Sequence, residues 1–175
     1  MDVFNNIFSL IKRQFKMGTT HQNFLDETGG GWRKSSKSVE TFHQSTFNPE
    51  EIKGSFQLLV NTILDLELVF FLRQQAAKGI SNKRNGRLQK KLKCSAGTFS
   101  IVTPRDRNGE FNPIFIKKWK KQLTDETLAE LASILSDANR PDSVAASLHV
   151  IFNTAYPKDV LNEMAAEISR ILCGE

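Results

Sequence analysis

The segment from residue 49 to about residue 78 constrains the fold most, because it predicts a long helix that is apolar around more than half of its circumference. Asn48 and Pro49 suit a helix start, and Glu50 and Glu51 suit its positive end. Its apolar positions are Phe56, Leu59, Val60, Ile63, Leu64, Phe70 and Phe71. Such a helix must be covered on several sides or must self-associate.

Charge is strongly segregated along the chain. The block from Arg73 to Gln122 contains 14 of the 24 Lys and Arg residues but two of the 19 acids, Asp106 and Glu110. Its formal charge is therefore +12, and the 10 cations and 17 acids elsewhere give −7. Segregation of this kind costs self-repulsion, which a bound polyanion neutralises. The basic block therefore predicts a nucleic-acid partner.

Two strands are predicted inside the basic block, Leu88 to Cys94 and Thr98 to Thr103, around a turn at residues 95 to 97. In the second strand, Phe99 and Ile101 alternate with polar neighbours, as in a strand with one buried face. The pattern predicts a small basic β-hairpin.

Two further segments complete the block. Arg107-Asn108-Gly109 predicts a reversal, because Asn-Gly tolerates positive φ. The IKKWKK segment from Ile116 to Lys121 is expected to form a helix whose lysines surround Trp119.

Helical segments are also predicted towards both ends. Val3 to Phe15 has amphipathic helical spacing, and a Gly- and Ser-rich linker follows it. Thr124 is an N-cap candidate for a helix, and Ser143 to Phe152 and Pro157 to Leu172 predict two more. The predicted fold class is α+β: mostly helical, with a small basic β-hairpin between a long N-terminal helix and a C-terminal helical segment.

We divide the chain into three parts. Residues 1–48 are an amphipathic helix plus flexible linker, residues 49–123 a basic DNA-binding region, and residues 124–175 an acidic helical tail. The start of the chain lacks the basic residues of a secretory signal, and the apolar stretch from Phe56 to Leu72 is short for a bilayer span. Cys94 and Cys173 are expected to be free thiols. We therefore expect a cytoplasmic protein with no membrane partner.

The predicted DNA contacts are basic side chains, since Lys and Arg bind phosphates and Arg also donates two hydrogen bonds to the edge of guanine. These residues are Lys83, Arg84, Arg87, Lys90, Lys91, Lys93, Arg105, Arg107, Lys117, Lys118, Lys120 and Lys121. The same residues would also suit an ordinary solvated face or a charged strand edge. Trp119 would either stack on an unpaired base or anchor its helix to the core.

No pattern of acids, histidines or cysteines predicts a catalytic or metal site. Asp65 and Glu67 are two positions apart on a helix, so their side chains point in different directions. Asp106 is expected to cap backbone N–H groups of its turn or to pair with an arginine. The three histidines are dispersed and lack metal-ligand spacing. We therefore expect no cofactor and no metal.

The order of these motifs resembles one family. RNG at Arg84 to Gly86 is followed by a Lys-rich strand, a small-residue turn, a second strand, PRDRNGEFNP at Pro104 to Pro113, and IKK at Ile116 to Lys118. This order is similar to the N-terminal region of bacterial mutator-type insertion-sequence transposases. The resemblance covers roughly Phe56 to Leu123 and is strongest from Arg84 to Lys118, while the segments outside it do not match the family pattern.

The resemblance implies that the chain binds DNA in transposition and DNA recombination. Its implied partner is double-stranded DNA at the terminal repeat of the element. In that family a ribonuclease-H-like catalytic domain follows, in which three carboxylates hold two divalent ions. This chain stops at Glu175, where that domain would only be beginning. The resemblance therefore implies a truncated transposase region that lacks the catalytic core and is not an enzyme on its own.

Two other functions stay open at this stage. The chain could be a protein-interaction module, or a transposase remnant that acts by mixed oligomerisation. In that case it would pair with itself or with a full-length transposase through the Phe56 to Leu72 helix. It could also bind an anionic membrane surface through Met1 to Phe15.

Overall fold

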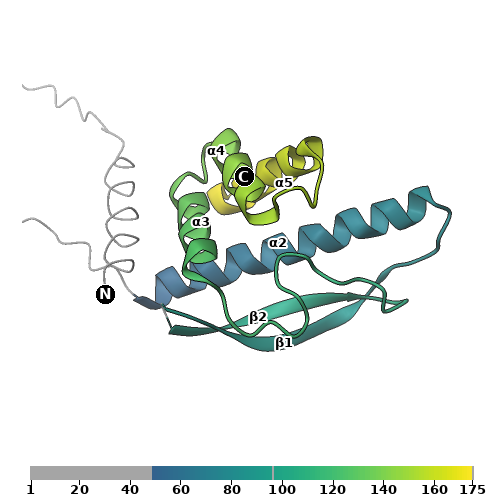
Figure 1. The fold of residues 1–175 in the computed structure, drawn as a ribbon, viewed down its shortest axis with the longest axis horizontal. Helices are drawn as coiled ribbons and strands as arrows, with labels where there is room; N and C mark the ends of the chain where they lie inside the picture. Colours follow the sequence, from purple (N-terminus) through teal and green to yellow (C-terminus); the bar gives the residue numbers. More distant parts are fainter. Residues whose placement is uncertain (1–48, 96, 175) are drawn as a thin grey trace, which may run out of the picture.

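The computed structural model describes residues 49–95 and 97–174. Along the chain it contains α2 (Pro49–Ala77), β1 (Arg84–Cys94), β2 (Gly97–Asp106), α3 (Asp125–Ser136), α4 (Pro141–Phe152) and α5 (Lys158–Cys173). The hairpin lies along one side of α2, and the three shorter helices gather on the other side (Figure 1). The predicted α+β fold class is thus confirmed. The predicted helix from Val3 to Phe15 and the linker after it lie outside the described residues.

α2 is the central element of the fold. It ends at Ala77, and Gly79 at φ 73° follows it as the predicted cap, with the Ile80 N–H donating back to the Gln75 carbonyl. Its apolar positions are covered on several sides, by the hairpin and by α3 and α5. Leu59, Val60, Ile63, Leu64 and Leu68 are fully buried. Self-association through this face would therefore require opening the fold.

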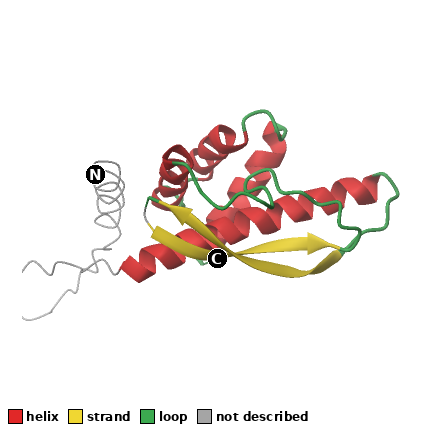
Figure 2. Cartoon of the chain, turned by 60° about the horizontal axis from the view of Figure 1, so that its bottom comes forward, coloured by secondary structure: helices red, strands yellow, loops and turns green. Residues whose placement is uncertain are grey.

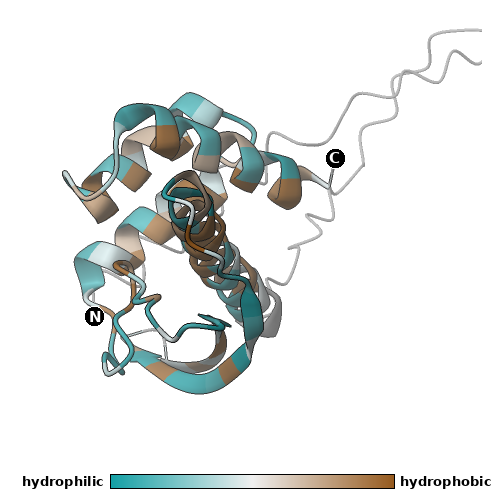
Figure 3. Ribbon diagram, turned by 90° about the vertical axis from the view of Figure 1, so that its right-hand side faces the viewer, coloured by the Kyte–Doolittle hydropathy of each residue, from teal (hydrophilic) through white to brown (hydrophobic). Residues whose placement is uncertain are grey.

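α2 also has the length and composition of a membrane span between Ile52 and Ala77. The estimate that this stretch is too short was wrong, because the helix continues beyond Leu72. A core helix passes the same test, and half of the residues in the window are buried inside this fold. Figure 3, which looks along α2, shows apolar positions concentrated on this helix while the hairpin is largely hydrophilic.

The predicted hairpin is confirmed, and both strands extend further from the turn than predicted. β1 and β2 are antiparallel, with Leu92 opposite Phe99 and Arg84 opposite Asp106. Figure 2 shows the two strands twisting about each other beside α2. A two-stranded ribbon twists strongly, so different parts of one face turn towards different neighbours.

The acidic C-terminal segment folds as three helices. The Thr124 side chain accepts a hydrogen bond from the Thr127 backbone N–H at 3.3 Å, which confirms the predicted N-cap. α4 and α5 agree with the two predicted helical segments to within two residues at each end. These helices share one apolar core with α2 and the hairpin. Its fully buried large side chains include Leu92, Ile101, Ile116, Leu128, Leu131, Ile134, Leu148 and Leu161.

Candidate nucleic-acid interface

The IKKWKK segment lies along the outer edge of β1 and is not the helix that the sequence predicts. The Lys93 N–H donates to the Lys121 carbonyl, and the Leu123 N–H donates to the Lys93 carbonyl, both at 2.8 Å. Ile116 and Leu123, on either side of the segment, are buried in the core. The free backbone groups of the strand edge therefore bind residues 121–123, and the residues before them form a turn in place of a helix.

The Lys90 side chain binds the middle of this segment from β1. Its Nζ donates to the carbonyl oxygens of Lys117, Lys118 and Lys120 at 3.1, 3.5 and 3.3 Å. Burial lowers the pKa of the Lys90 ammonium. Its three acceptors explain how a half-buried amine is accommodated, because each carbonyl replaces a water hydrogen bond. Lys90, predicted as a DNA contact, therefore has a structural role.

Five of the predicted DNA contacts come together at this end of the hairpin. Leu92 faces the core, so its neighbours Lys91 and Lys93 project to the opposite face, where both are exposed. The adjoining segment adds exposed lysines on either side of Trp119. We call this group the lysine cluster; it consists of Lys91, Lys93, Lys117, Lys118 and Lys121. Lys120, within the same segment, is half-buried.

At the other end of β1, the RNG motif forms a β-bulge. Arg84 and Arg87 are three residues apart, yet they pair with Asp106 and Pro104, which are two residues apart. Gly86 takes the positive φ of 72° at the extra residue. Positions three apart on a regular strand point to opposite faces. The bulge therefore returns both arginines to one face.

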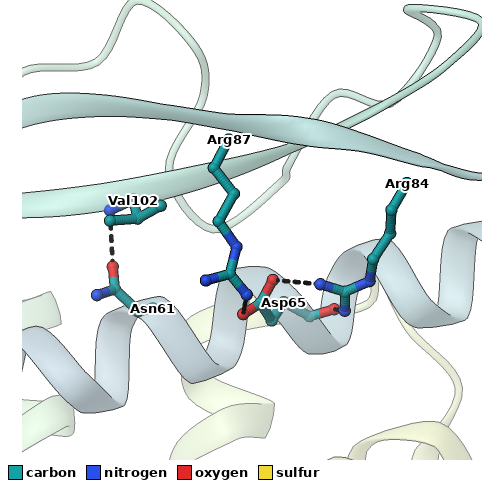
Figure 4. A network of polar contacts seen from close by, with 5 residues as sticks. All are labelled: Asn61, Asp65, Arg84, Arg87 and Val102. Carbon is teal, nitrogen blue, oxygen red and sulfur yellow. Dashed lines mark hydrogen bonds and ion pairs between the residues drawn. The ribbon is translucent and has the colours of Figure 1, made fainter.

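Both of these arginines bind one acid on α2. Arg84 Nη1 donates to Asp65 Oδ1 at 2.9 Å, and Arg87 Nη2 donates to Asp65 Oδ2 at 3.1 Å (Figure 4). One turn earlier on α2, the Asn61 side chain accepts a hydrogen bond from the Val102 N–H at 2.8 Å. The two arginines predicted as DNA contacts thus tie the hairpin to α2. They remain exposed at their outer surfaces.

Asp106 organises the RDRNG turn from inside. It is buried, and its Oδ2 accepts from Asn82 Nδ2 at 2.8 Å and from the Glu110 N–H at 3.1 Å. Its Oδ1 accepts from the Phe111 N–H at 3.1 Å. Burial acts to raise the pKa of this carboxyl, but the hydrogen bonds outweigh burial and lower it. The prediction that Asp106 caps backbone N–H groups is confirmed.

The remaining predicted contacts flank this turn. Lys83, Arg105 and Arg107 are exposed, and the Arg107 N–H donates to the Lys83 carbonyl at 2.8 Å. They lie about ten strand residues from Lys93, which corresponds to roughly 30 Å at about 3.3 Å per residue. The predicted DNA contacts are therefore divided between two ends of the hairpin.

Glu67 is a structural residue that the sequence did not reveal. It is fully buried, and its Oε1 accepts from the Ile114 N–H at 2.8 Å, the Phe115 N–H at 3.4 Å and the Tyr156 hydroxyl at 3.1 Å. Desolvation raises its pKa to about 7, against the lowering effect of these hydrogen bonds. Asp65, two residues earlier, faces the hairpin instead, as the spacing predicts. One sequence signal for Glu67 is an acid on an apolar helix face.

A pair of divalent ions of the kind implied by the resemblance does not fit this part of the chain. Among residues 49–95 and 97–174, no group of three or more His, Cys, Asp and Glu side chains is placed to hold a metal ion. The buried carboxylates have other partners: Asp106 binds three donors of its turn, and Glu67 binds three donors in the core.

A family model for the mutator family of transposases matches residues 32–168. This chain belongs to the mutator family. The match extends beyond the predicted limits of Phe56 to Leu123 and includes most of the acidic helices. That extent agrees with the structure, in which α3, α4 and α5 share the core of α2 and the hairpin.

Among curated proteins, this mutator-family chain is similar to the transposase for insertion sequence element IS905 of Lactococcus lactis subsp. lactis (strain IL1403). The two are 29% identical over 86 residues. The alignment covers 47% of this chain and 22% of that protein, so the matched part spans less than a quarter of the relative's length.

Proposed function

We propose that this chain is a DNA-binding region of a mutator-family transposase and contacts the duplex at the terminal repeat of an insertion sequence. Its family relationship supports a role in transposition. The observation that carries the DNA-binding proposal is the lysine cluster, which is exposed on a hairpin edge fixed by backbone hydrogen bonds. Cations held on a rigid support neutralise phosphates with little loss of conformational freedom.

The two ends of the hairpin suggest how such binding would run along a duplex. The lysine cluster lies at one end, and Lys83, Arg105 and Arg107 are exposed at the other. Their separation of roughly 30 Å is close to one turn of B-DNA, about 34 Å. In the proposed mode, the lysine cluster supplies phosphate contacts, and the arginines beside the RDRNG turn supply phosphate or guanine contacts about one turn away.

Salt-dependent binding tests this proposal. We expect the 175-residue chain to bind a duplex of about 20 base pairs with log K falling against log salt at a slope near −5, if about six phosphates are contacted. The K91Q/K93Q variant should lose about two from the magnitude of that slope, and its affinity should fall by more than about tenfold near 0.1 M salt. Fluorescence anisotropy measures both quantities.

A matched variant controls for net charge. Lys78 and Lys158 are exposed and lie outside the lysine cluster, so K78Q/K158Q removes the same charge at other places. It should keep a slope close to that of the wild type. Equal losses in the two variants would mean that binding depends on net charge alone and would contradict the proposed surface.

A further inference from the structure

Trp119 has an unusual position for a tryptophan. The residue is 71% exposed, the highest value among the large hydrophobic residues that are exposed in the described part of the chain. It contributes little to the core, in contrast to the nearby Phe115, which is buried. The alternative that Trp119 anchors its segment to the core is therefore excluded. Its ring is available to a ligand.

The ring stands at the tip of a fixed turn. The Lys120 N–H donates to the Lys117 carbonyl at 2.9 Å, which closes a four-residue turn with Lys118 and Trp119 at its centre. Lys90 Nζ binds three carbonyl oxygens of this turn from the hairpin side. A ring presented on a turn held in this way is preorganised for a partner.

The surroundings of the ring favour an anionic partner with a flat aromatic part. Lys117 Nζ lies 5.9 Å from the Trp119 ring centroid, and Lys118 and Lys121 are exposed in the same segment. Single-stranded nucleic acid has this chemistry, because aromatic side chains stack on its bases while lysines bind its phosphates. Bases within a duplex already stack on one another and offer no free face.

We propose that the turn from Lys117 to Lys120 is a stacking platform for an unpaired nucleotide, with Trp119 as the stacking surface. The inference rests on the proposed DNA binding and specifies its substrate class: a duplex with an unpaired base beside it, such as a frayed or overhanging end. The lysine cluster holds the backbone, and Trp119 holds the unpaired base.

Anisotropy with two probes tests the platform. The probes are a blunt duplex and the same duplex with an overhang of about four nucleotides on either strand. The W119A variant should bind the overhang probe about tenfold more weakly and the blunt duplex less than about twofold more weakly. W119F should retain most of the overhang affinity, because it keeps a ring. Val150, 65% exposed on α4, supplies the control V150A, which should leave both affinities unchanged.

Fluorescence gives a second readout. The chain has two tryptophans, so a W32F variant leaves Trp119 as the single reporter. Its emission should be quenched when the single-stranded overhang binds, and quenched much less by the blunt duplex. Because Trp119 is exposed, W119A should unfold at the same urea concentration as the wild type, so a binding loss would not reflect misfolding.

The outcomes separate this inference from the proposed function. If the wild type binds duplex DNA through the lysine cluster but W119A loses nothing, or loses equally on both probes, the platform is overturned and the DNA-binding proposal stands. A wild type that binds neither probe at low salt overturns both. Selective loss on the overhang probe, with quenching of Trp119, establishes the platform.

Discussion

Replacing Asp106 with asparagine is expected to destabilise the protein by about 3 kcal/mol, nearly as much as replacing it with alanine. The donors of the turn are divided between both oxygens: Asn82 and Glu110 bind Oδ2, and Phe111 binds Oδ1. An asparagine has one oxygen and one NH₂ group, so either orientation sets a donor against a donor. The usual conservative exchange therefore fails at this site.

Urea unfolding of D106N and E110Q measures this effect. Glu110 is an exposed acid in the same turn, so E110Q loses a charge without losing a buried acceptor and should stay within about 0.5 kcal/mol of the wild type.

The stability that Asp106 provides also has a predicted pH dependence. Because its folded pKa is lowered below 3.8, this stability is present above that value and is lost as the pH falls further. Equal unfolding midpoints for D106N and the wild type would show that the turn does not need this carboxylate.

The same exchange at Glu67 should have the opposite result. Burial raises its pKa from 4.5 to about 7, so between these values the folded protein keeps a proton that the unfolded chain has released. Stability should therefore fall by about 3 kcal/mol as the pH rises through this window, and then level off. In E67Q this fall should be absent. Its amide oxygen can still accept from Ile114 and Tyr156, which reach Oε1 alone, and from Phe115, whose N–H lies 3.4 Å from Oε1 and 3.3 Å from Oε2.

Urea unfolding of the wild type and E67Q from about pH 5 to about pH 8 measures this difference. At the upper end, E67Q should be at least as stable as the wild type, because the wild type then carries a buried charge. Parallel pH profiles would show that Glu67 titrates normally in the folded protein and would contradict the account of its burial.

The elements that could be predicted from the sequence are those with local signals. α2 begins at Pro49 and is followed by Gly79 as expected, because caps and helix breakers act within a few residues. The hairpin follows from alternating Phe99 and Ile101 and from the small-residue turn. The helix after Thr124 follows from its cap.

The features that could not be predicted depend on partners far away in the sequence. The IKKWKK segment has the pattern of a basic helix, but its hydrogen bonds to the edge of β1 and to the Lys90 ammonium keep it non-helical. From the sequence, Arg84 and Arg87 are expected to be free cations. In the structure, the bulge between them directs both to Asp65, about twenty residues earlier. Composition identified the basic block, but only the fold shows which of its cations bind groups of the protein, as Arg84, Arg87 and Lys90 do.

Lysine acetylation footprinting tests the central claim most directly, because it reports each amine of the unmodified chain with and without duplex DNA. The account predicts that DNA protects Lys91, Lys93, Lys117, Lys118 and Lys121, while the exposed Lys78 and Lys158 stay reactive. Lys90 should react slowly in both states, because its Nζ binds three carbonyls. Uniform protection of all lysines, or protection that leaves the lysine cluster reactive, would contradict the proposal that this cluster is the DNA-contacting surface.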